Sequence, residues 1–296
     1  VNMTITVFTP TFNRATLLPR LYESLVNQTF LDFEWLIVDD GSTDDTFNFI
    51  ESIKENDKID IQYYYQNNAG KHAAINWGVE LAKGDLFFIV DSDEVMIESG
   101  LQTIVDVYKQ VSDNDNFAGV TGLKSFFSGK TIGGELNYTY LDCSAIDYNL
   151  KYKYGGEMAV AYRTKILQKY PFPIFEGEKY CGEGLIWYKI ALHYKLRYFA
   201  HPIILTEYYP DGLTALGVNK RMESPKTTLA TYSELSKMNV PFNSRIRYII
   251  NFWRFFCCDK QRGFACKLKL VNKSTILLFP LGYCLHLIDI FKTKRR

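Results

Sequence analysis

The stretch Leu86–Glu94, with the sequence Leu-Phe-Phe-Ile-Val-Asp-Ser-Asp-Glu, decides the fold, because a wholly apolar run ends abruptly in acids. A short apolar run without alternation is typical of a strand that is buried on both faces of a sheet. Such sheets are parallel, and their ligands bind beyond the carboxyl ends of the strands. The carboxylates of Asp91 and Asp93 therefore stand where we expect a ligand.

Three strand and helix signals precede this stretch in alternation. Strands separated by helices imply right-handed crossovers and a parallel sheet. We therefore predict an α/β fold with a Rossmann-like, mostly parallel sheet flanked by helices. The expected order is a strand over Thr4–Thr9, helical spacing from Leu17 to Val26, a strand over Glu34–Asp39, a helix opened by the turn Gly41–Asp44 and running to about Lys54, a strand over Ile59–Tyr65, and a helix from Ala69-Gly70 through Ala82.

The sequence after Glu94 predicts a second half of the same domain and a helical tail. We interpret residues 3–240 as one domain, with a nucleotide-binding half over 3–95 and an acceptor half over 96–240. After Val240-Pro241 the composition changes, and basic and aromatic residues mix. We expect residues 241–296 to form a C-terminal amphipathic helical extension.

The end of this tail suggests contact with a membrane surface. Thr275–Phe291 is largely apolar but is interrupted by a proline, a histidine and an aspartate, and a spanning helix needs about 20 apolar residues. Lys292–Arg296 is rich in basic residues, which favour anionic lipids. We expect helices that lie peripherally on an anionic membrane. The alternative is an appendage packed on the core or against a second subunit.

Composition narrows the class of protein. Hydrophobic residues make up 47% and charged residues 23%, which excludes disorder. The net charge of +1 indicates no global attraction to nucleic acid, and we expect no nucleic-acid partner. The six cysteines follow no zinc or C-x-x-C spacing, and no signal peptide precedes the first strand. We therefore expect a reduced, cytoplasmic protein.

Asp91 and Asp93 are candidate ligands of a divalent metal. Mg²⁺ prefers oxygen ligands and usually bridges one or two carboxylates to phosphates. In sugar transfer, a metal on the diphosphate leaving group neutralises the charge that builds as the bond breaks. Two acids one residue apart are also common in solvated turns, which is the alternative. The preceding strand and a second acid pair, Asp39-Asp40, favour a functional site.

Two further positions are candidates for holding a nucleotide. A carboxylate at Asp39 or Asp40 could accept from the N3–H of uracil or from ribose hydroxyls, although a helix-capping role is the alternative. Lys71 begins a predicted helix, where its charge and the helix N-terminus would attract a phosphate. By itself, Lys71 is equally well explained as a surface lysine.

Four motifs stand in order along roughly the first hundred residues: Thr9-Pro10-Thr11-Phe12-Asn13-Arg14, Val38–Asp44, Asn68-Ala69-Gly70-Lys71 with Ala74 and Asn76, and Asp91-Ser92-Asp93. Together they resemble the family 2 glycosyltransferases of the GT-A fold. The resemblance implies an inverting glycosyltransferase that uses Mn²⁺ or Mg²⁺. Its donor would be a nucleotide-sugar, with a UDP-sugar expected. Its acceptor would be a glycan or a lipid-linked oligosaccharide in bacterial surface polysaccharide synthesis.

The same resemblance implies a role for each matching residue. It places the ribose of the nucleotide-sugar and the metal on Asp91 and Asp93, with Asp93 as the more direct ligand of the metal. It places the remaining residues against the nucleotide-sugar: Thr9, Pro10, Thr11 and Arg14 lining the pocket, Asp40 with Asp39 on uracil and ribose, Lys71 on the nucleotide, and Ser92 beside Asp91.

An inverting transfer also needs a general base that deprotonates the acceptor hydroxyl. The family usually places it in a Glu-Asp pair at the start of a helix, and the matching stretch Cys181–Trp187 keeps only Glu183. Glu183 is therefore our candidate base, with Glu178 and Asp142 as alternatives. Weaker resemblance to acceptor-side motifs covers Phe172-Pro173, Gly177–Tyr180, Glu207-Tyr208 and Asp211–Thr214.

Two other classes of protein fit parts of the pattern. A sugar nucleotidyltransferase would normally carry a Gly-rich, basic loop after the first strand, whereas this loop reads Thr-Pro-Thr-Phe-Asn-Arg. A non-catalytic nucleotide-sugar or carbohydrate-binding module would need no base at Glu183.

Overall fold

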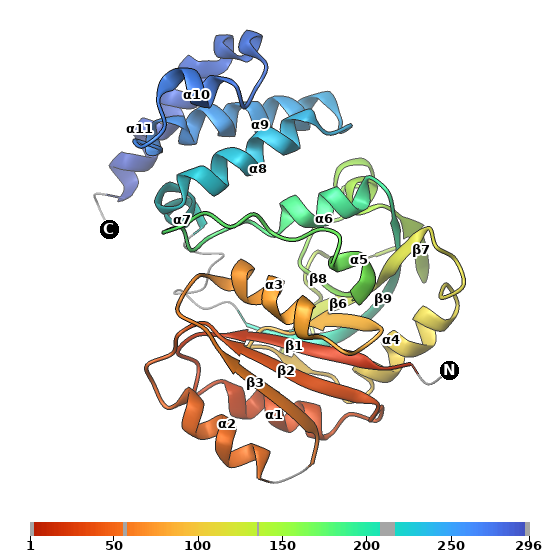
Figure 1. Ribbon diagram of the computed structural model, residues 1–296. Coiled ribbons are helices and arrows are strands. Elements are labelled where there is room, and N and C mark those ends of the chain that lie inside the picture. Colours follow the sequence, from red (N-terminus) through yellow and green to blue (C-terminus); the bar gives the residue numbers. More distant parts are fainter. Residues whose placement is uncertain (1–2, 56–57, 135, 208–216, 294–296) are drawn as a thin grey trace. The chain divides into compact units, whose positions relative to one another are not determined.

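The computed structural model describes residues 3–55, 58–134, 136–207 and 217–293 (Figure 1). The chain forms two compact units. We call residues 1–171 and 189–208 the α/β unit, and residues 172–188 and 209–296 the helical unit.

One nine-stranded sheet forms the centre of the α/β unit. Its strands follow the order β3-β2-β1-β4-β8-β6-β9-β5, and β7 pairs with β9. In chain order, the strands are β1 (Ile5–Thr11), β2 (Phe33–Asp39), β3 (Asp60–Tyr65), β4 (Leu86–Ile89), β5 (Val95–Met96), β6 (Phe117–Phe126), β7 (Tyr140–Cys143), β8 (Met158–Arg163) and β9 (Lys195–Thr206).

The first four strands are parallel, which confirms the prediction for this part of the chain. β1 pairs with β2 and β4, and β2 pairs with β3. The register places Thr11 opposite Asp39 and Asp39 opposite Tyr65, so these strands end together at one edge. Beyond β4 the sheet is mixed, because β8 runs antiparallel to β4 and β6 while β6 and β9 are parallel.

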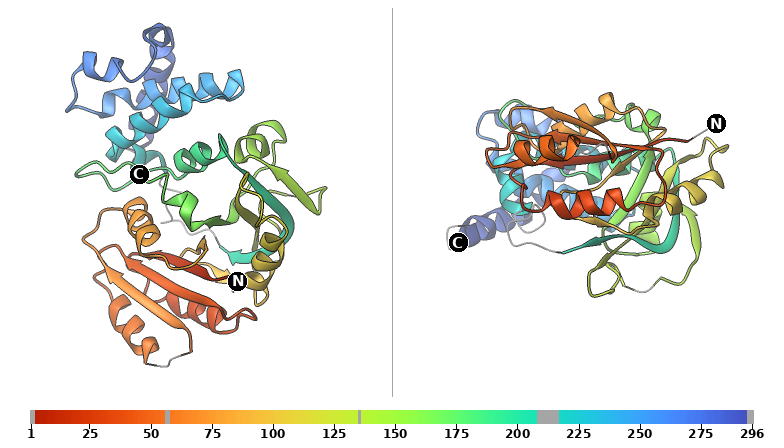
Figure 2. Two further views of the ribbon diagram at one scale, coloured as in Figure 1. Left: turned by 45° about the vertical axis from the view of Figure 1, so that its right-hand side comes forward. Right: turned by 90° about the horizontal axis from the view of Figure 1, so that it is seen from below.

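Helices cover both faces of the parallel part, as its apolar strands require. α1 (Leu18–Val26) and α2 (Thr46–Lys54) lie on one side of β1–β3, and α3 (Lys71–Leu81) lies on the other (Figures 1 and 2). α3 approaches closely at Gly78, where a Cβ would stand 2.1 Å from the Phe8 ring. The other helical elements that begin before residue 208 are α4 (Gly100–Lys109), η1 (Asp147–Lys151), α5 (Thr164–Leu167) and α6 (Gly184–Ala191), the last of which begins in the helical unit.

The helical unit has its own aromatic core. Phe252, Trp253 and Phe255 are at most 1% exposed and pack with Leu229. Its later helices are α7 (Gly217–Glu223), α8 (Pro225–Lys237), α9 (Phe242–Phe255), η2 (Phe256–Cys258), α10 (Phe264–Leu268), η3 (Lys273–Leu278) and α11 (Phe279–Thr293).

These contacts group the residues differently from the boundary that we placed at residue 240. Leu229 of α8 belongs to the same buried cluster as the aromatic residues of α9. The compact helical unit therefore begins before residue 240, because α8 completes its core. The division into donor, acceptor and membrane-binding parts remains a proposal.

Candidate functional site

The predicted donor-side residues gather at the carboxyl edge of the parallel strands. Asp39 ends β2, Asp91 and Asp93 follow β4, and Lys71 begins α3. We call these four residues together with Asp40 the strand-end cluster. Their proximity follows from the register, because neighbouring parallel strands bring their carboxyl ends to one edge.

Lys71 and Asp91 form the central contact of this cluster. The Lys71 ammonium lies 2.7 Å from Oδ1 and 2.9 Å from Oδ2 of Asp91. Burial alone would raise the pKa of Asp91, but Lys71 and Lys124 outweigh it and hold the pKa below its usual value. Asp91 is therefore an ionised carboxylate whose charge is largely balanced by the protein.

The surroundings of Asp93 shift its pKa in the opposite direction from that of Asp91. Burial and the charge of Asp91 raise its pKa, with Arg14 and Lys71 acting weakly against them. Two neighbouring carboxylates with one weakly balanced charge are a suitable environment for a divalent cation.

A cation at this position would need ligands from the substrate as well. Among the residues that the structure describes, no group of three or more His, Cys, Asp or Glu side chains is arranged to hold a metal. An ion that bridges a diphosphate requires only one or two protein carboxylates and completes its shell with phosphates and water. Asp93, with Asp91 beside it, fits this kind of ion.

Asp40 orients the loop that leads into Lys71. Its Oδ1 accepts hydrogen bonds from Gln66 Nε2 at 2.6 Å and from the Ala69 N–H at 2.7 Å, and its Oδ2 accepts from the Gly70 N–H at 2.9 Å. Both oxygens are thus engaged by the protein. The role on uracil and ribose that the resemblance implies stays a prediction, and this structure gives Asp40 a positioning role.

Asp39 ties the neighbouring loops together. Its carboxylate accepts from the Ser42 N–H and from the Tyr63 hydroxyl, both at 2.8 Å. Gly41, at φ +89°, lets this loop approach its neighbour, since a Cβ there would stand 2.9 Å from the Asn68 nitrogen. Asp39 and Asp40 together therefore fix the loops that carry Ser42 and Gly70.

The first predicted motif, Thr9–Arg14, contributes core packing through Thr9 and a buried hydroxyl group through Thr11. Thr9 is fully buried, and its Oγ1 accepts from Trp35 Nε1 at 2.9 Å, so its side chain packs in the core instead of joining the cluster. Pro10 and Ser92 are also buried. The Thr11 hydroxyl, at the end of β1, is buried without a hydrogen-bond partner among the described residues. Arg14 contributes positive potential at Asp91 and Asp93.

The sequence analysis missed a buried ion pair behind the acids. Lys124 Nζ lies 2.5 Å from Glu94 Oε1, and the side chains are 10% and 3% exposed. The other oxygen, Glu94 Oε2, accepts from the Asp91 N–H at 3.1 Å. Burial raises the pKa of Glu94 to about 7, with Lys124 acting against it. The feature of the sequence that could have indicated this pair is Lys124, a charged residue within the stretch that forms the buried strand β6.

The three candidate bases differ in how the protein uses them. Glu183 directly precedes α6, and its carbonyl oxygen accepts from the Ile186 and Trp187 N–H groups, so it begins the helix as predicted. Asp142 is paired through both oxygens with Arg197, at 2.8 Å and 2.6 Å.

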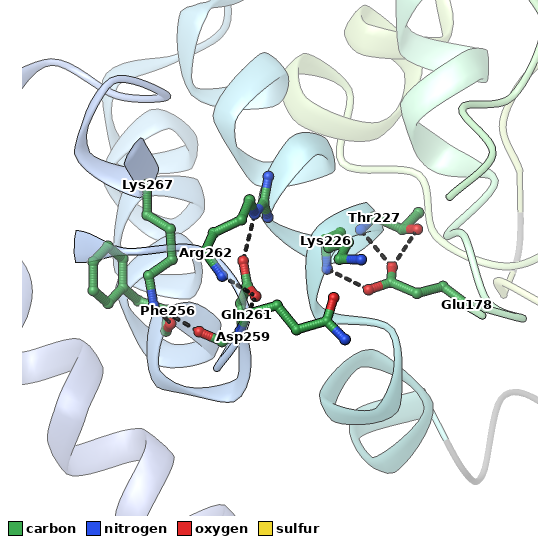
Figure 3. A network of polar contacts seen from close by, with 8 residues as sticks. All are labelled: Glu178, Lys226, Thr227, Phe256, Asp259, Gln261, Arg262 and Lys267. Atoms are coloured by element: carbon green, nitrogen blue, oxygen red, sulfur yellow. Dashed lines mark hydrogen bonds and ion pairs between the residues drawn. The ribbon is translucent and has the colours of Figure 1, made fainter. Parts of the chain in front are cut away.

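Glu178 has a structural role in the helical unit. Figure 3 shows its carboxylate facing the first turn of α8. It accepts from the N–H groups of Lys226 and Thr227 and from the Thr227 hydroxyl, each at 2.7 Å. These contacts satisfy backbone donors that have no partner within the helix. Of the weaker acceptor-side motifs, Tyr208 and Asp211–Thr214 lie outside the described residues.

Sequence comparison finds a family match over the first half of the chain. Residues 6–149 match the model of glycosyl transferase family 2. A GalNAc(5)-diNAcBac-PP-undecaprenol β-1,3-glucosyltransferase from Campylobacter jejuni is 27% identical over 224 residues, which cover 73% of this chain and 68% of that protein. The chain spans only about a third of the next curated relatives that it matches.

Solved structures share the fold over nearly the whole chain. A crystal structure of S. aureus TarS (residues 1–349) in complex with UDP matches with a TM-score of 0.64 at 18% identity, covering 97% of this chain and 88% of that one. The mannosyltransferase PcManGT from Pyrobaculum calidifontis, in complex with GDP-Man and Mn²⁺, matches with a TM-score of 0.58 at 18% identity, covering 99% and 83%. These likenesses confirm the predicted GT-A fold.

Proposed function

We propose that this chain, whose residues 6–149 match the model of glycosyl transferase family 2, transfers a sugar from a nucleoside-diphosphate sugar to a hydroxyl of a lipid-linked oligosaccharide. The observation that carries the proposal is the charge arrangement of the strand-end cluster. Lys71 balances Asp91, whereas Asp93 remains a weakly balanced carboxylate at the same edge. An anionic diphosphate and a divalent cation together complement these charges.

The cofactor in this proposal is Mn²⁺ or Mg²⁺. Asp93 would hold it, with Asp91 alongside, because their environment favours an added positive charge. A bound divalent ion would supply charge neutralisation for the departing diphosphate. The complex of PcManGT with GDP-Man and Mn²⁺ supports this choice for the fold.

The protein's own groups would orient the donor. Lys71 and Arg14 contribute positive charge, and the N-terminus of α3 adds backbone N–H groups directed toward an anion. Asp40 holds the turn from which α3 begins, so it fixes Lys71 before a donor binds. Such preorganisation keeps the cost of orienting charged groups out of the reaction step.

We assign the general base to Glu183. Glu183 directly precedes α6, at the position where the resemblance places the family's base, whereas Glu178 holds the start of α8 and Asp142 is paired with Arg197. Removal of the acceptor proton by Glu183 would give a single in-line displacement with inversion.

The donor and acceptor classes are inferred from similar proteins. UDP is bound in the TarS complex, and a further TarS structure contains UDP-GlcNAc. The Campylobacter relative is named for transfer to an undecaprenol-linked oligosaccharide. We therefore propose a UDP-sugar donor and a lipid-linked acceptor, which places the reaction at the cytoplasmic surface of a membrane.

A nucleotide-sugar screen tests this proposal. Thermal shift with UDP- and GDP-sugars, each with Mn²⁺ or with EDTA, should show stabilisation by one donor only when metal is present. Mass spectrometry of undecaprenyl-linked oligosaccharides incubated with that donor should then show the addition of one sugar. Release of pyrophosphate instead of UDP would indicate a nucleotidyltransferase, and donor binding without any product would indicate a binding module.

A further inference from the structure

The last helix of the chain has its polarity reversed relative to a helix on a water-soluble core. The buried residues of α11 are Gly282, His286 and Asp289. Its exposed residues include apolar side chains, with Leu281 50% exposed and Phe291 56% exposed. A helix on a soluble domain normally turns apolar side chains inward and polar ones outward. The exposed apolar side chains of the final segment are Ile276, Leu277, Leu281, Tyr283, Leu287, Ile288 and Phe291.

Specific contacts with α9 fix this orientation. Arg254 holds Asp289 through two hydrogen bonds, at 2.5 Å from Nε and 2.7 Å from Nη2. Gly282 allows the helices to approach, because a Cβ there would stand 2.5 Å from the Trp253 Cβ. A rotation of α11 that buried its apolar face would break the ion pair and force this side of the helix apart. The outward direction of the apolar face is therefore part of the fold.

Residues 241–296, which include η3 and α11, carry a much more positive charge than the rest of the chain. Residues 241–296 contain twelve Lys or Arg and two Asp, which gives a formal charge of +10, whereas the whole chain carries +1. The other 240 residues must then carry −9. The overall charge of +1 conceals this division.

The two acids of this segment do not reduce its attraction for anions. Asp289 and Asp259 are buried, and Asp289 is paired with Arg254. Asp259 is paired with Arg262, as Figure 3 shows. Exposed lysines flank the apolar face on both sides in sequence, at Lys260, Lys269, Lys273 and Lys292. The surface thus combines exposed apolar side chains with unbalanced positive charge.

Length alone would allow this segment to cross a membrane, contrary to our estimate from the apolar run. In the described part of the chain, one helical segment, Lys273–Thr293, has sufficient length and apolarity, with a mean hydropathy of 1.6 over its most apolar window. Spanning would place Asp289 and Arg254 within the hydrocarbon, where ionised groups are costly. A helix that lies in the plane of the interface keeps this pair and α9 on the aqueous side.

We propose that η3 and α11 form a bilayer-docking surface, whose apolar side chains enter the boundary of headgroups and acyl chains of an anionic leaflet. The flanking lysines would contact the lipid headgroups. A second copy of this chain fits less well, because a symmetric contact would bring two strongly basic surfaces together. This inference adds to the proposed function the means by which the enzyme stays where a lipid-linked acceptor lies.

Vesicle binding by the full-length protein tests this proposal. We expect it to float with vesicles that contain phosphatidylglycerol and to remain unbound with pure phosphatidylcholine. The double variant L287E/I288E changes only exposed side chains and should weaken binding by about tenfold or more. The matched control is L31E in the α/β unit, which alters a leucine that is 73% exposed and should bind as the wild type does.

Further measurements separate the alternatives. K269E/K273E should weaken binding at low salt, and added salt should reduce that difference. The proposal is overturned if the wild type ignores anionic vesicles, if L287E/I288E binds normally, or if light scattering shows a dimer that L287E/I288E dissociates. Resistance of the bound protein to extraction at alkaline pH would show spanning and would also overturn it. UDP binding in the absence of lipid should be equal in all variants, so a failure here is distinct from a failure of the proposed function.

Discussion

The ammonium group of Lys71 contacts both carboxylate oxygens of Asp91, at 2.7 Å and 2.9 Å, and thereby joins the start of α3 to the end of β4. Because of this contact, Asp91 and Asp93 have different electrostatic environments. Asp91 has a protein cation as its partner, whereas burial and Asp91 itself raise the pKa of Asp93. The first residue therefore organises the cluster, and the second is the better candidate to bind a metal.

Replacing Lys71 with methionine should weaken nucleotide binding. The variant removes a charge that would contact the diphosphate and leaves Asp91 without its closest cation, so we expect a loss of about 1.5–3 kcal/mol, or roughly tenfold to a hundredfold in Kd. Calorimetric titration with UDP and Mn²⁺ measures the change. Lys83→Met is the matched control, because the Lys83 side chain is 69% exposed. An unchanged Kd for the Lys71 variant would remove this lysine from the nucleotide site.

Replacing Asp93 with asparagine should weaken metal binding without harming the fold. Electron paramagnetic resonance should show weaker Mn²⁺ binding in the presence of UDP, while the neighbouring control Glu98→Gln, at an exposed position, should bind normally. Retained Mn²⁺ affinity in the Asp93 variant would contradict the assignment.

The same variant should have a pH signature in metal-free buffer. Because the pKa of Asp93 is raised in the folded state, the folded protein binds this proton more tightly than the unfolded chain does. The wild type therefore loses stability from this group as the pH rises above the unfolded pKa. Asp93→Asn should melt at the same temperature as the wild type near pH 3 and at a slightly higher one at pH 7. A lower melting temperature at pH 7 would show that the carboxylate is stabilising.

Replacing Lys124 with methionine should destabilise the protein. Glu94, at 3% exposure, would lose its cation and would have to bind a proton or remain an uncompensated buried charge, and breaking a buried pair in this way costs about 3–5 kcal/mol. The double variant Lys124→Met/Glu94→Gln removes both charges and should regain most of the loss, as urea unfolding would measure. If the single variant unfolds like the wild type, the pair does not support the Asp91–Glu94 turn.

The parallel half of the fold was predictable because its signals are local. Apolar runs such as Leu86–Ile89 and helical spacing such as that of α1 lie within short windows, and the resulting alternation predicts the topology. The second half depends on pairings between distant strands of mixed direction, such as β4 with β8, and no short window contains them. The sequence could therefore predict an acceptor region there but not its sheet.

The candidate site divides in the same way. The position of Asp91 and Asp93 follows from the end of one strand. The role of Asp40 depends on where the fold brings Ala69 and Gly70, since a carboxylate at a strand end can face either a ligand or a neighbouring loop. Thr9 likewise turned out to bond Trp35 of the adjacent strand. Residue type and spacing do not distinguish such alternatives, whereas the paired structure does.

Glu183 and Glu178 offer the clearest test of the acceptor side, because the same isosteric change should affect them differently. Glu178→Gln replaces an acceptor oxygen with an amide group facing the donors at the start of α8. We expect it to lower stability by about 1–3 kcal/mol and to leave the transfer rate of the folded enzyme nearly unchanged. Glu183→Gln should leave the UDP affinity unchanged and lower kcat of the folded enzyme by about 10²–10⁴. Single-turnover assays and thermal melts of both variants measure these effects, and a Glu183 variant with normal kcat would move the base elsewhere.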